Sequence, residues 1–285
     1  MFKVLSLSPT KAKFGPLLFA GNLLQGLKKA SELGYDGVEI SLRDTKEINY
    51  SWLKKNLLKL NLKVYGIATG QTYYNDGFSL YNSQSDKRDK AIQRMKEHID
   101  LATKLGSIVI IGGIRGKLEN DLAIERQLNS GKEAIREIAE YAYHHQVTLV
   151  IEAINRYETN IFNTLLQIKD FIKELKFPNL KILADTFHMN LEEVSYRQAL
   201  LEVKDHIGYI HFADSNRWAP GWGHINFREI INVLKEINFK GPVGIEVLPL
   251  PEDLKAAQQG IVFLNKFIEG EEREELKGSK EISPL

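Results

Sequence analysis

The feature that most constrains how this 285-residue chain can fold is a regular alternation of two kinds of segment. Short aliphatic or β-branched runs, typical of buried parallel strands, alternate with longer amphipathic stretches that are typical of helices. The strand candidates are residues 3–8, 37–41, 63–69, 107–111, 148–152, 181–185, 207–211 and 242–247. The helix candidates are residues 22–33, 51–60, 87–105, 121–145, 164–175, 194–204, 227–237 and 252–268. Eight strands, each followed by a helix, predict a (β/α)8 barrel.

Glycines at the ends of the helix candidates support this interpretation. Gly34 and Gly106 follow the first and third helix candidates, and Gly241 precedes the last strand candidate. Glycine commonly ends a helix because it adopts the left-handed conformation without a steric penalty. No Pro/Gly/Ser-rich linker divides the chain, so we expect one catalytic domain over residues 1–268 and a charged tail over residues 269–285. A doubly wound open sheet is the alternative fold, but no G-x-G-x-x-G motif follows the first strand candidate.

Composition excludes several classes of protein. The chain has 38 Lys plus Arg against 37 Asp plus Glu, a net charge of +1, which gives no electrostatic signature for nucleic acid or an anionic membrane. It has no cysteine, which excludes disulfides, thiolate zinc sites and a cysteine nucleophile. The first residues contain no long apolar run typical of a secretory leader, and no run approaches 18 apolar residues. We therefore expect a cytoplasmic protein without a membrane or nucleic-acid partner.

Ionisable residues close the last four strand candidates. The apolar runs of these strands lead into Glu152, Asp185, His211 and Glu246, respectively. The active site of a (β/α)8 barrel is built at the carboxyl ends of its strands, so we expect the four side chains to meet. Four ionisable groups on one rim need a shared counter-ion. Each residue taken singly has another interpretation: a loop-facing carboxylate, a helix cap at Asp185, or a buried barrel histidine.

The donor set indicates which ion would bind. Three carboxylates and one imidazole suit Mn²⁺, Co²⁺ or Mg²⁺ better than a structural zinc ion. We therefore expect one divalent metal ion as the cofactor, with Mn²⁺ favoured and Co²⁺ or Mg²⁺ as alternatives.

Three segments carry a family resemblance: EAINRYE at 152–158, ADTFHMN at 184–190 and HFADSNR at 211–217. They resemble the signature blocks of the ketose 3-epimerases, which include the D-tagatose and D-allulose 3-epimerases. This family is part of the xylose-isomerase-like superfamily of barrel-fold sugar isomerases and epimerases. GYDGVEI at 34–40 and GPVGIE at 241–246 fit the same pattern. The resemblance covers the chain to about residue 268.

The resemblance implies a site and an activity. The family's metal ligands correspond to Glu152, Asp185, His211 and Glu246. The residues that contact the reacting end of the sugar correspond to Glu158, His188 and Arg217. The resemblance also implies that Glu152 and Glu246 are the catalytic acid and base, and that the protein is a homodimer or homotetramer.

Physical chemistry supports this division of roles. A metal ion on the carbonyl oxygen stabilises the enediolate that forms when the neighbouring carbon loses its proton. Inversion of that carbon needs proton transfer on both faces. Glu152 lies on the fifth strand candidate and Glu246 on the eighth, so they approach from well-separated directions. This favours epimerisation at C3 of a ketohexose such as D-tagatose, D-allulose or D-fructose.

Arg115 departs from the free-ketose pattern. The segment IIGGIRG at 110–116 places this arginine where the loop leaves the fourth strand candidate, and a guanidinium there suits a carboxylate or phosphate on the distal end of the substrate. The segment NRWAPGWGH at 216–224 also resembles a branch that includes 5-keto-L-gluconate epimerases. A keto sugar acid of the 5-keto-L-gluconate or D-tagaturonate type is therefore the alternative substrate, with Arg115 as a substrate-binding residue. Otherwise Arg115 is an exposed loop residue.

Three further functions compete. An aldose–ketose or hydroxypyruvate-type isomerase would use the same metal and glutamates. A metal-dependent endonuclease on the same barrel is disfavoured by the net charge of +1 and the small number of histidines at strand ends. A non-catalytic sugar-binding barrel would leave the Glu152 and Glu246 pair without a role. The loop TGQTYYNDG at 69–77 is expected either to contact a sugar or to pack beneath a long connection.

Overall fold

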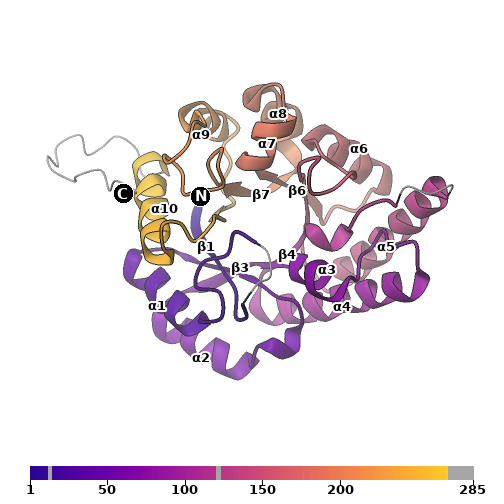
Figure 1. Ribbon diagram of the computed structural model, residues 1–285, viewed down its shortest axis with the longest axis horizontal. Coiled ribbons are helices and arrows are strands. Elements are labelled where there is room, and N and C mark those ends of the chain that lie inside the picture. The colour runs from indigo at the N-terminus through magenta and orange to yellow at the C-terminus, as the bar shows by residue number, and fades with distance from the viewer. Residues whose placement is uncertain (12–14, 120–122, 269–285) are drawn as a thin grey trace, which may run out of the picture.

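The computed structural model describes residues 1–11, 15–119 and 123–268, and it contains a closed barrel of parallel strands (Figure 1). Strand order follows the sequence, and β1 pairs with β8 to close the sheet. The strands are β1 (Phe2–Leu7), β2 (Gly37–Ser41), β3 (Lys63–Ala68), β4 (Ile108–Ile111), β5 (Leu149–Glu152), β6 (Leu180–Asp185), β7 (Ile207–Phe212) and β8 (Pro242–Ile245). The predicted (β/α)8 barrel is confirmed. The predicted tail over residues 269–285 lies outside the described residues.

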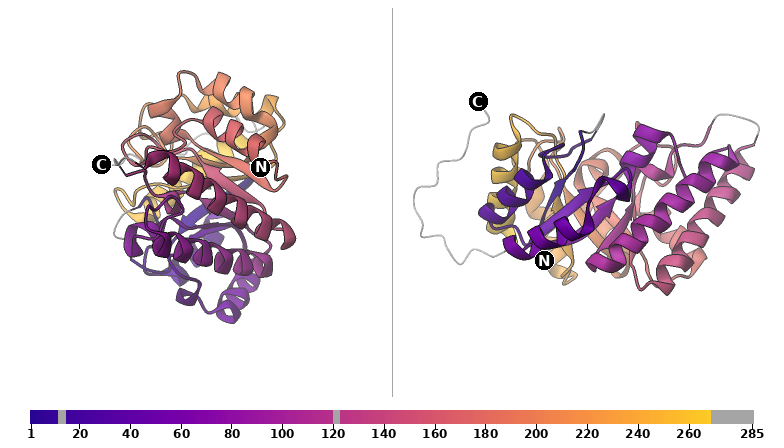
Figure 2. Two further views of the ribbon diagram at one scale, coloured as in Figure 1. Left: turned by 90° about the vertical axis from the view of Figure 1, so that its right-hand side faces the viewer. Right: turned by 90° about the horizontal axis from the view of Figure 1, so that it is seen from below.

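A ring of helices covers the outside of the barrel (Figures 1 and 2). The helices that alternate with the strands are α1 (Leu23–Leu33), α2 (Tyr50–Leu60), α4 (Ser85–Leu105), α5 (Ile124–His144), α6 (Leu165–Leu175), α8 (Tyr196–Val203), α9 (Phe227–Glu236) and α10 (Asp253–Ile268). Each overlaps a helix predicted from the sequence. The two 21-residue helices, α4 and α5, pack side by side on one flank. None of the described helices is long and apolar enough to cross a membrane.

Short helices at the carboxyl ends of strands were not predicted. Two are α-helical, α3 (Gly70–Asp76) after β3 and α7 (Thr186–Glu192) after β6. Two are 3₁₀ turns, η1 (Thr45–Glu47) after β2 and η2 (Gly113–Arg115) after β4, whereas a third 3₁₀ turn, η3 (Lys204–His206), directly precedes β7. Of these, α3, α7 and η2 contribute residues to the rim where the ionisable side chains gather. The loop expected at 69–77 is therefore mostly helix α3.

The glycines predicted where helices stop adopt the left-handed conformation at two of three positions. Gly34 and Gly106 adopt the left-handed conformation, with φ of 85° and 66°. Before β8 the left-handed residue is Asn238 rather than Gly241, with φ of 54°. Helix α9 ends at Glu236, so the reversal falls soon after it. Gly241 serves close packing instead, since a Cβ there would lie 2.5 Å from the ring of Phe239.

Successive side chains of a strand point alternately into and out of the barrel, so every second residue faces inward. Inward-facing side chains of β3 to β7 form a plug inside it: Ala68, Ile110, Val150, Leu183 and Tyr209. Two residues after Val150, Leu183 and Tyr209 come Glu152, Asp185 and His211, which therefore also face inward, one layer nearer the carboxyl end. The apolar plug closes the barrel beneath the polar rim.

One buried histidine makes stability depend on pH. His98 on α4 is completely buried, and burial, aided by the positive charge of Arg94, lowers its pKa to about 3. In the unfolded chain histidine takes up a proton below about pH 6.5, whereas the folded protein resists protonation until much lower pH. As the pH falls from about 6 towards 4, the free energy of unfolding should therefore fall by about 1.4 kcal/mol per pH unit from this group.

Urea unfolding of wild type and His98→Gln at pH 7.5, 6.0 and 5.0 measures this contribution. The variant should show a shallower loss of stability between pH 6 and 5, whatever its stability at pH 7.5. His144→Gln, at an exposed position on α5, is the matched control. If the free energy of unfolding depended on pH equally in all three proteins, the lowered pKa of His98 would be contradicted.

Candidate metal centre and active site

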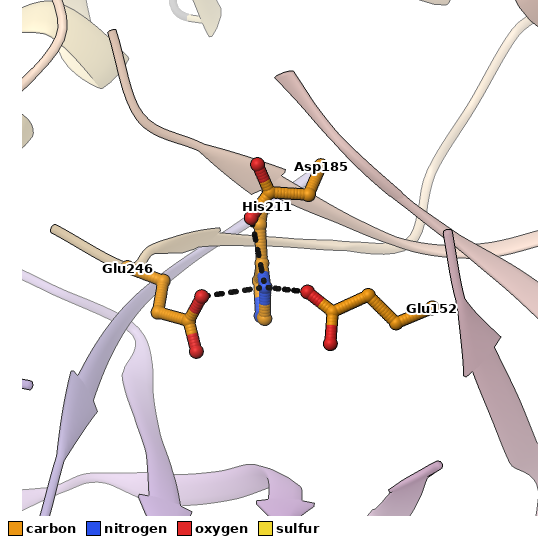
Figure 3. A group of neighbouring side chains, drawn as sticks. All are labelled: Glu152, Asp185, His211 and Glu246. Atoms are coloured by element: carbon orange, nitrogen blue, oxygen red, sulfur yellow. Dashed lines mark ion pairs between the residues drawn. The ribbon is translucent and has the colours of Figure 1, made fainter. Parts of the chain in front are cut away.

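Glu152, Asp185, His211 and Glu246 meet at the carboxyl end of the barrel (Figure 3). The imidazole Nδ1 of His211 lies 3.8 Å from Glu152 Oε1, 3.6 Å from Asp185 Oδ2 and 3.5 Å from Glu246 Oε2. One ligand atom from each residue can be chosen so that all four atoms lie within 4.8 Å of one another. The structure thus brings together the four side chains that the strand ends singled out.

Strand position explains this convergence. Glu152 and Asp185 are the last residues of β5 and β6, His211 is the penultimate residue of β7, and Glu246 directly follows β8. Asp185 is the strand partner of His211, which in turn pairs with Gly244. A Cβ at Gly244 would lie 3.0 Å from His211 Cδ2, so this glycine leaves room for the imidazole.

The carboxylate of Asp185 has two separate tasks. Its Oδ1 accepts hydrogen bonds from the backbone N–H groups of Phe187 (2.8 Å) and His188 (3.3 Å), which caps the N-terminus of α7. Its Oδ2 faces His211 and the other carboxylates. The helix-cap interpretation and the cluster interpretation of Asp185 are therefore both correct, each for a different oxygen.

Arg217 joins two members of the cluster. Its Nη1 lies 2.9 Å from Asp185 Oδ2, and its Nη2 donates to Glu246 Oε2. The guanidinium carbon lies 4.9 Å from the ring centroid of Phe187, within the range of a cation–π contact. Arg217 has a φ of 63°, an uncommon left-handed conformation for a residue with a side chain. Burial alone would raise the pKa of Asp185, but Arg217, His188 and His211 together outweigh burial and hold that pKa below its usual range.

The other ionisable groups of the cluster also depart from their usual pKa. Burial raises the pKa of Glu152 to about 7, and the negative charges of Glu246 and Asp185 also raise it. The imidazole of His211 has the opposite effect and lowers that pKa. Burial alone would lower the pKa of His211, but the charges of Glu39 and Glu246 raise it well above its ordinary value. These shifts reflect several carboxylates competing for one proton or cation in a space with little water.

His188 is held as a neutral hydrogen-bonding group. Burial and the nearby charge of Arg217 lower its pKa to about 3. The amide Nδ2 of Asn155 donates to His188 Nδ1 (2.8 Å) and to Glu158 Oε1 (2.9 Å). The amide is oriented because its Oδ1 accepts from the backbone N–H of Tyr157 (3.0 Å). Since Nδ1 is an acceptor, the proton of the neutral imidazole lies on Nε2.

A cavity of about 550 Å³, part of it open to solvent, lies at this rim. Glu158, His188 and Arg217 line it together with Glu152, His211 and Glu246. Gln71 and Tyr74 from α3, and Gly112 and Gly113 in the segment after β4, also line it. The cavity therefore brings the three residues that the resemblance implied for sugar contact beside the cluster. Asn155 was not singled out from the sequence, although it lies between Glu152 and Glu158 in one of the signature blocks.

Arg115 lies elsewhere than the sequence analysis expected. Its side chain is completely buried and is not part of the cavity lining, so it is neither an exposed loop residue nor a group facing the cavity. The turn η2 directs it away, and the guanidinium carbon lies 5.7 Å from the ring centroid of Phe162. Its three side-chain nitrogens have no hydrogen-bond partner among the described residues, and burial lowers its pKa to about 10.

Gly112 leaves the space that Glu152 occupies. A Cβ at this position would lie 2.5 Å from Glu152 Oε2, closer than non-bonded atoms approach. Gly112→Ala should therefore displace the carboxylate, lower metal affinity and cut kcat by about 10-fold or more, since displacements near 1 Å can cost about 10²-fold. Isothermal titration with Mn²⁺, alongside kinetics, checks this. Thermal unfolding establishes that the variant is folded, and unchanged Mn²⁺ affinity in a folded variant would contradict the prediction.

Comparison with known proteins places the chain in a family. The family model described as "Xylose isomerase-like TIM barrel" matches residues 27–267. The chain belongs to this family. An L-ribulose 3-epimerase of Methylomonas sp. (strain DH-1) is 31% identical over 230 residues, which cover 80% of this chain and 79% of the relative. A D-psicose 3-epimerase of Enterocloster bolteae is 30% identical over 231 residues, covering 77% of this chain and 75% of the relative.

Solved structures agree on the fold. The crystal structure of a D-allulose 3-epimerase from Methylomonas sp. in complex with D-allulose has a TM-score of 0.80 and 23% identity, covering 94% of this chain and 97% of the other. A more distant sequence relative, 25% identical, is the 3-dehydro-D-guloside 4-epimerase of Escherichia coli (strain K12), with 80% of this chain and 88% of the relative covered. The expected resemblance to ketose 3-epimerases, and with it the class of carbohydrate epimerase, is confirmed.

Proposed function

We propose that the protein is a divalent-metal-dependent epimerase that inverts the carbon beside the carbonyl of a ketose, C3 of a ketohexose such as D-tagatose, D-allulose or D-fructose. The observation that carries this proposal is the meeting of Glu152 and Glu246 around His211, inside a cavity that Glu158, His188 and Arg217 also line. The names of the 3-epimerase relatives support the same reaction class.

The residues present fit a divalent ion. His211 Nδ1 is buried and has no hydrogen-bond partner among the described residues. Its three carboxylate neighbours lie 3.5–3.8 Å away, too far for hydrogen bonds and well placed to share an ion whose bonds are about 2.0–2.6 Å long. Oxygen donors dominate the set, which favours Mn²⁺, with Co²⁺ and Mg²⁺ as alternatives. Such an ion supplies Lewis-acid polarisation of a carbonyl and stabilises the negative charge that develops on its oxygen.

The positions of the two glutamates support a role in inversion. Glu152 reaches the centre from β5 and Glu246 from β8, and their carboxylates lie on either side of the His211 imidazole (Figure 3). A ketose bound between them would present one face to each carboxylate. One glutamate then removes the proton at the carbon beside the carbonyl, and the other delivers a proton to the opposite face. A single base acting on one face would return the original configuration.

The remaining polar groups hold the substrate. With its Nδ1 occupied by Asn155, His188 can donate its Nε2–H to a sugar oxygen. Glu158 lines the cavity and can accept a hydrogen bond from a sugar hydroxyl. Arg217 offers a rigid fork of donors beside Asp185 and Glu246. Arg115 is not among the described residues that line the cavity, so the keto-acid alternative loses the residue that suggested it.

Replacing either glutamate tests the proton transfers. Glu152→Gln and Glu246→Gln keep the shape of the side chain but remove the base, and each should lower kcat by more than about 10²-fold. Turnover in D₂O, followed by NMR, should place deuterium at the inverted carbon for wild type. Metal analysis of each variant separates loss of the base from loss of the ion. Glu236→Gln, in a surface pair with Arg197, is the matched control. Full activity in both site variants would refute the assignment.

A substrate panel tests the reaction class. We expect the Mn²⁺-loaded protein to epimerise at least one of D-tagatose, D-allulose, D-fructose or L-ribulose, with NMR identifying the product. EDTA should abolish turnover, and added Mn²⁺ should restore it. The panel includes 5-keto-L-gluconate, D-tagaturonate and a 3-keto glycoside. Turnover of only these compounds would contradict the ketose 3-epimerase and favour an epimerase of keto sugar acids or keto glycosides. Formation of an aldose would favour an aldose–ketose isomerase. The homodimeric or homotetrameric state and the cytoplasmic location stay predictions from the sequence.

A further inference from the structure

The second nitrogen of the His211 imidazole is engaged by a carboxylate outside the cluster. His211 Nε2 lies 2.8 Å from Oε2 of Glu39, which belongs to β2 on the other side of the barrel. The other oxygen of Glu39, Oε1, accepts a hydrogen bond of 2.7 Å from the hydroxyl of Ser6 on β1. Ser6 and Glu39 are 0% exposed and His211 is 1% exposed. Three strands thus contribute to one buried chain of hydrogen bonds.

Neighbouring glycines make room for this chain. Gly66 on β3 is the strand partner of Glu39, and a Cβ there would lie 3.3 Å from Glu39 Oε2. A Cβ at Gly244 would likewise lie 3.0 Å from His211 Cδ2. The ring of Tyr209 packs edge-on against the imidazole, with centroids 5.2 Å apart. The side chains of Glu39 and His211 are therefore packed tightly on these sides, which holds them in the observed arrangement.

The direction of this contact determines what the imidazole can do. An ionised carboxylate only accepts hydrogen bonds, so a proton must lie on His211 Nε2 for the 2.8 Å contact to be a hydrogen bond. In a neutral imidazole that leaves the lone pair on Nδ1, the nitrogen that faces Glu152, Asp185 and Glu246. When a histidine binds a metal through one ring nitrogen, a carboxylate that accepts a hydrogen bond from the other nitrogen commonly fixes both the tautomer and the orientation of the ring.

We propose that Glu39, supported by Ser6, is a positioning residue that holds His211 in the tautomer and orientation in which Nδ1 can bind the divalent ion. This inference rests on the proposed function only in that a divalent ion must bind at the cluster. Glu39 does not line the cavity, so its effect on a reaction passes through His211.

Metal affinity provides a readout that does not depend on turnover. Isothermal titration with Mn²⁺ should show Glu39→Ala binding about 10- to 100-fold more weakly than wild type, the usual cost of losing such a partner. Glu39→Gln should recover part of this loss, because its amide oxygen can still accept the Nε2–H. Ser6→Ala should have a smaller effect, and Glu236→Gln on the surface should have none. The visible spectrum of the Co²⁺-loaded protein should change in Glu39→Ala, since the ring is no longer held in one orientation.

The tautomer is tested separately on the wild-type protein, which avoids any folding defect in the variants. Long-range ¹H–¹⁵N spectra of the ¹⁵N-histidine protein loaded with Zn²⁺ should show the His211 proton on Nε2. His211→Asn assigns the signal among the seven histidines. A proton on Nδ1, or Mn²⁺ affinities of both Glu39 variants within about twofold of wild type, would overturn the role of Glu39.

The same measurements distinguish this inference from the proposed function. If wild type binds Mn²⁺ and the Glu39 variants bind it weakly while no ketose is epimerised, the proposed reaction fails and the role of Glu39 stands. If ketoses are epimerised and the variants bind Mn²⁺ as wild type does, only the role of Glu39 fails. A wild-type protein that binds no divalent ion would overturn both.

Discussion

Concentration of negative charge at one end of the barrel is the constraint on which the rest of the site depends. Carboxylates of Glu152, Asp185 and Glu246 surround one imidazole within a few ångströms, almost out of contact with water. Buried like charges repel strongly unless cations or protons offset them. Arg217 and His211 supply part of that compensation within the chain, and a divalent ion would supply the rest. The barrel provides the rigid frame needed to hold the groups against their repulsion.

The fold and the core of the site were predictable because both depend on short-range patterns. Apolar runs of strand length, separated by amphipathic stretches, were enough to predict eight strands and their helices. The period of two along each strand then determined that Glu152 follows the inward-facing Val150, and that Asp185 and His211 follow Leu183 and Tyr209 in the same way. These regularities need no knowledge of contacts between distant segments.

The parts that were not predicted depend on long-range contacts or on the direction of a single turn. Glu39 lies within the apolar strand β2, and only the closed barrel brings it to His211, 172 residues away in sequence. Helix α3 has too few apolar residues to show a helical period, and it forms where Gly70 packs against Gly113. Arg115 lies in the predicted loop, but the turn η2 sends its side chain to Phe162 instead of the cavity.

The double use of Asp185 has a consequence for how mutations at this site are interpreted. One oxygen faces His211 and the other carboxylates, and the other oxygen anchors the first turn of α7, the helix that carries His188 and Phe187. A change at this single residue alters charge balance, helix initiation and the platform beneath Arg217 together. Mutational scans that score residues one at a time would attribute to Asp185 the combined loss of several neighbours. Only combinations of substitutions, compared with their single changes, can apportion that loss.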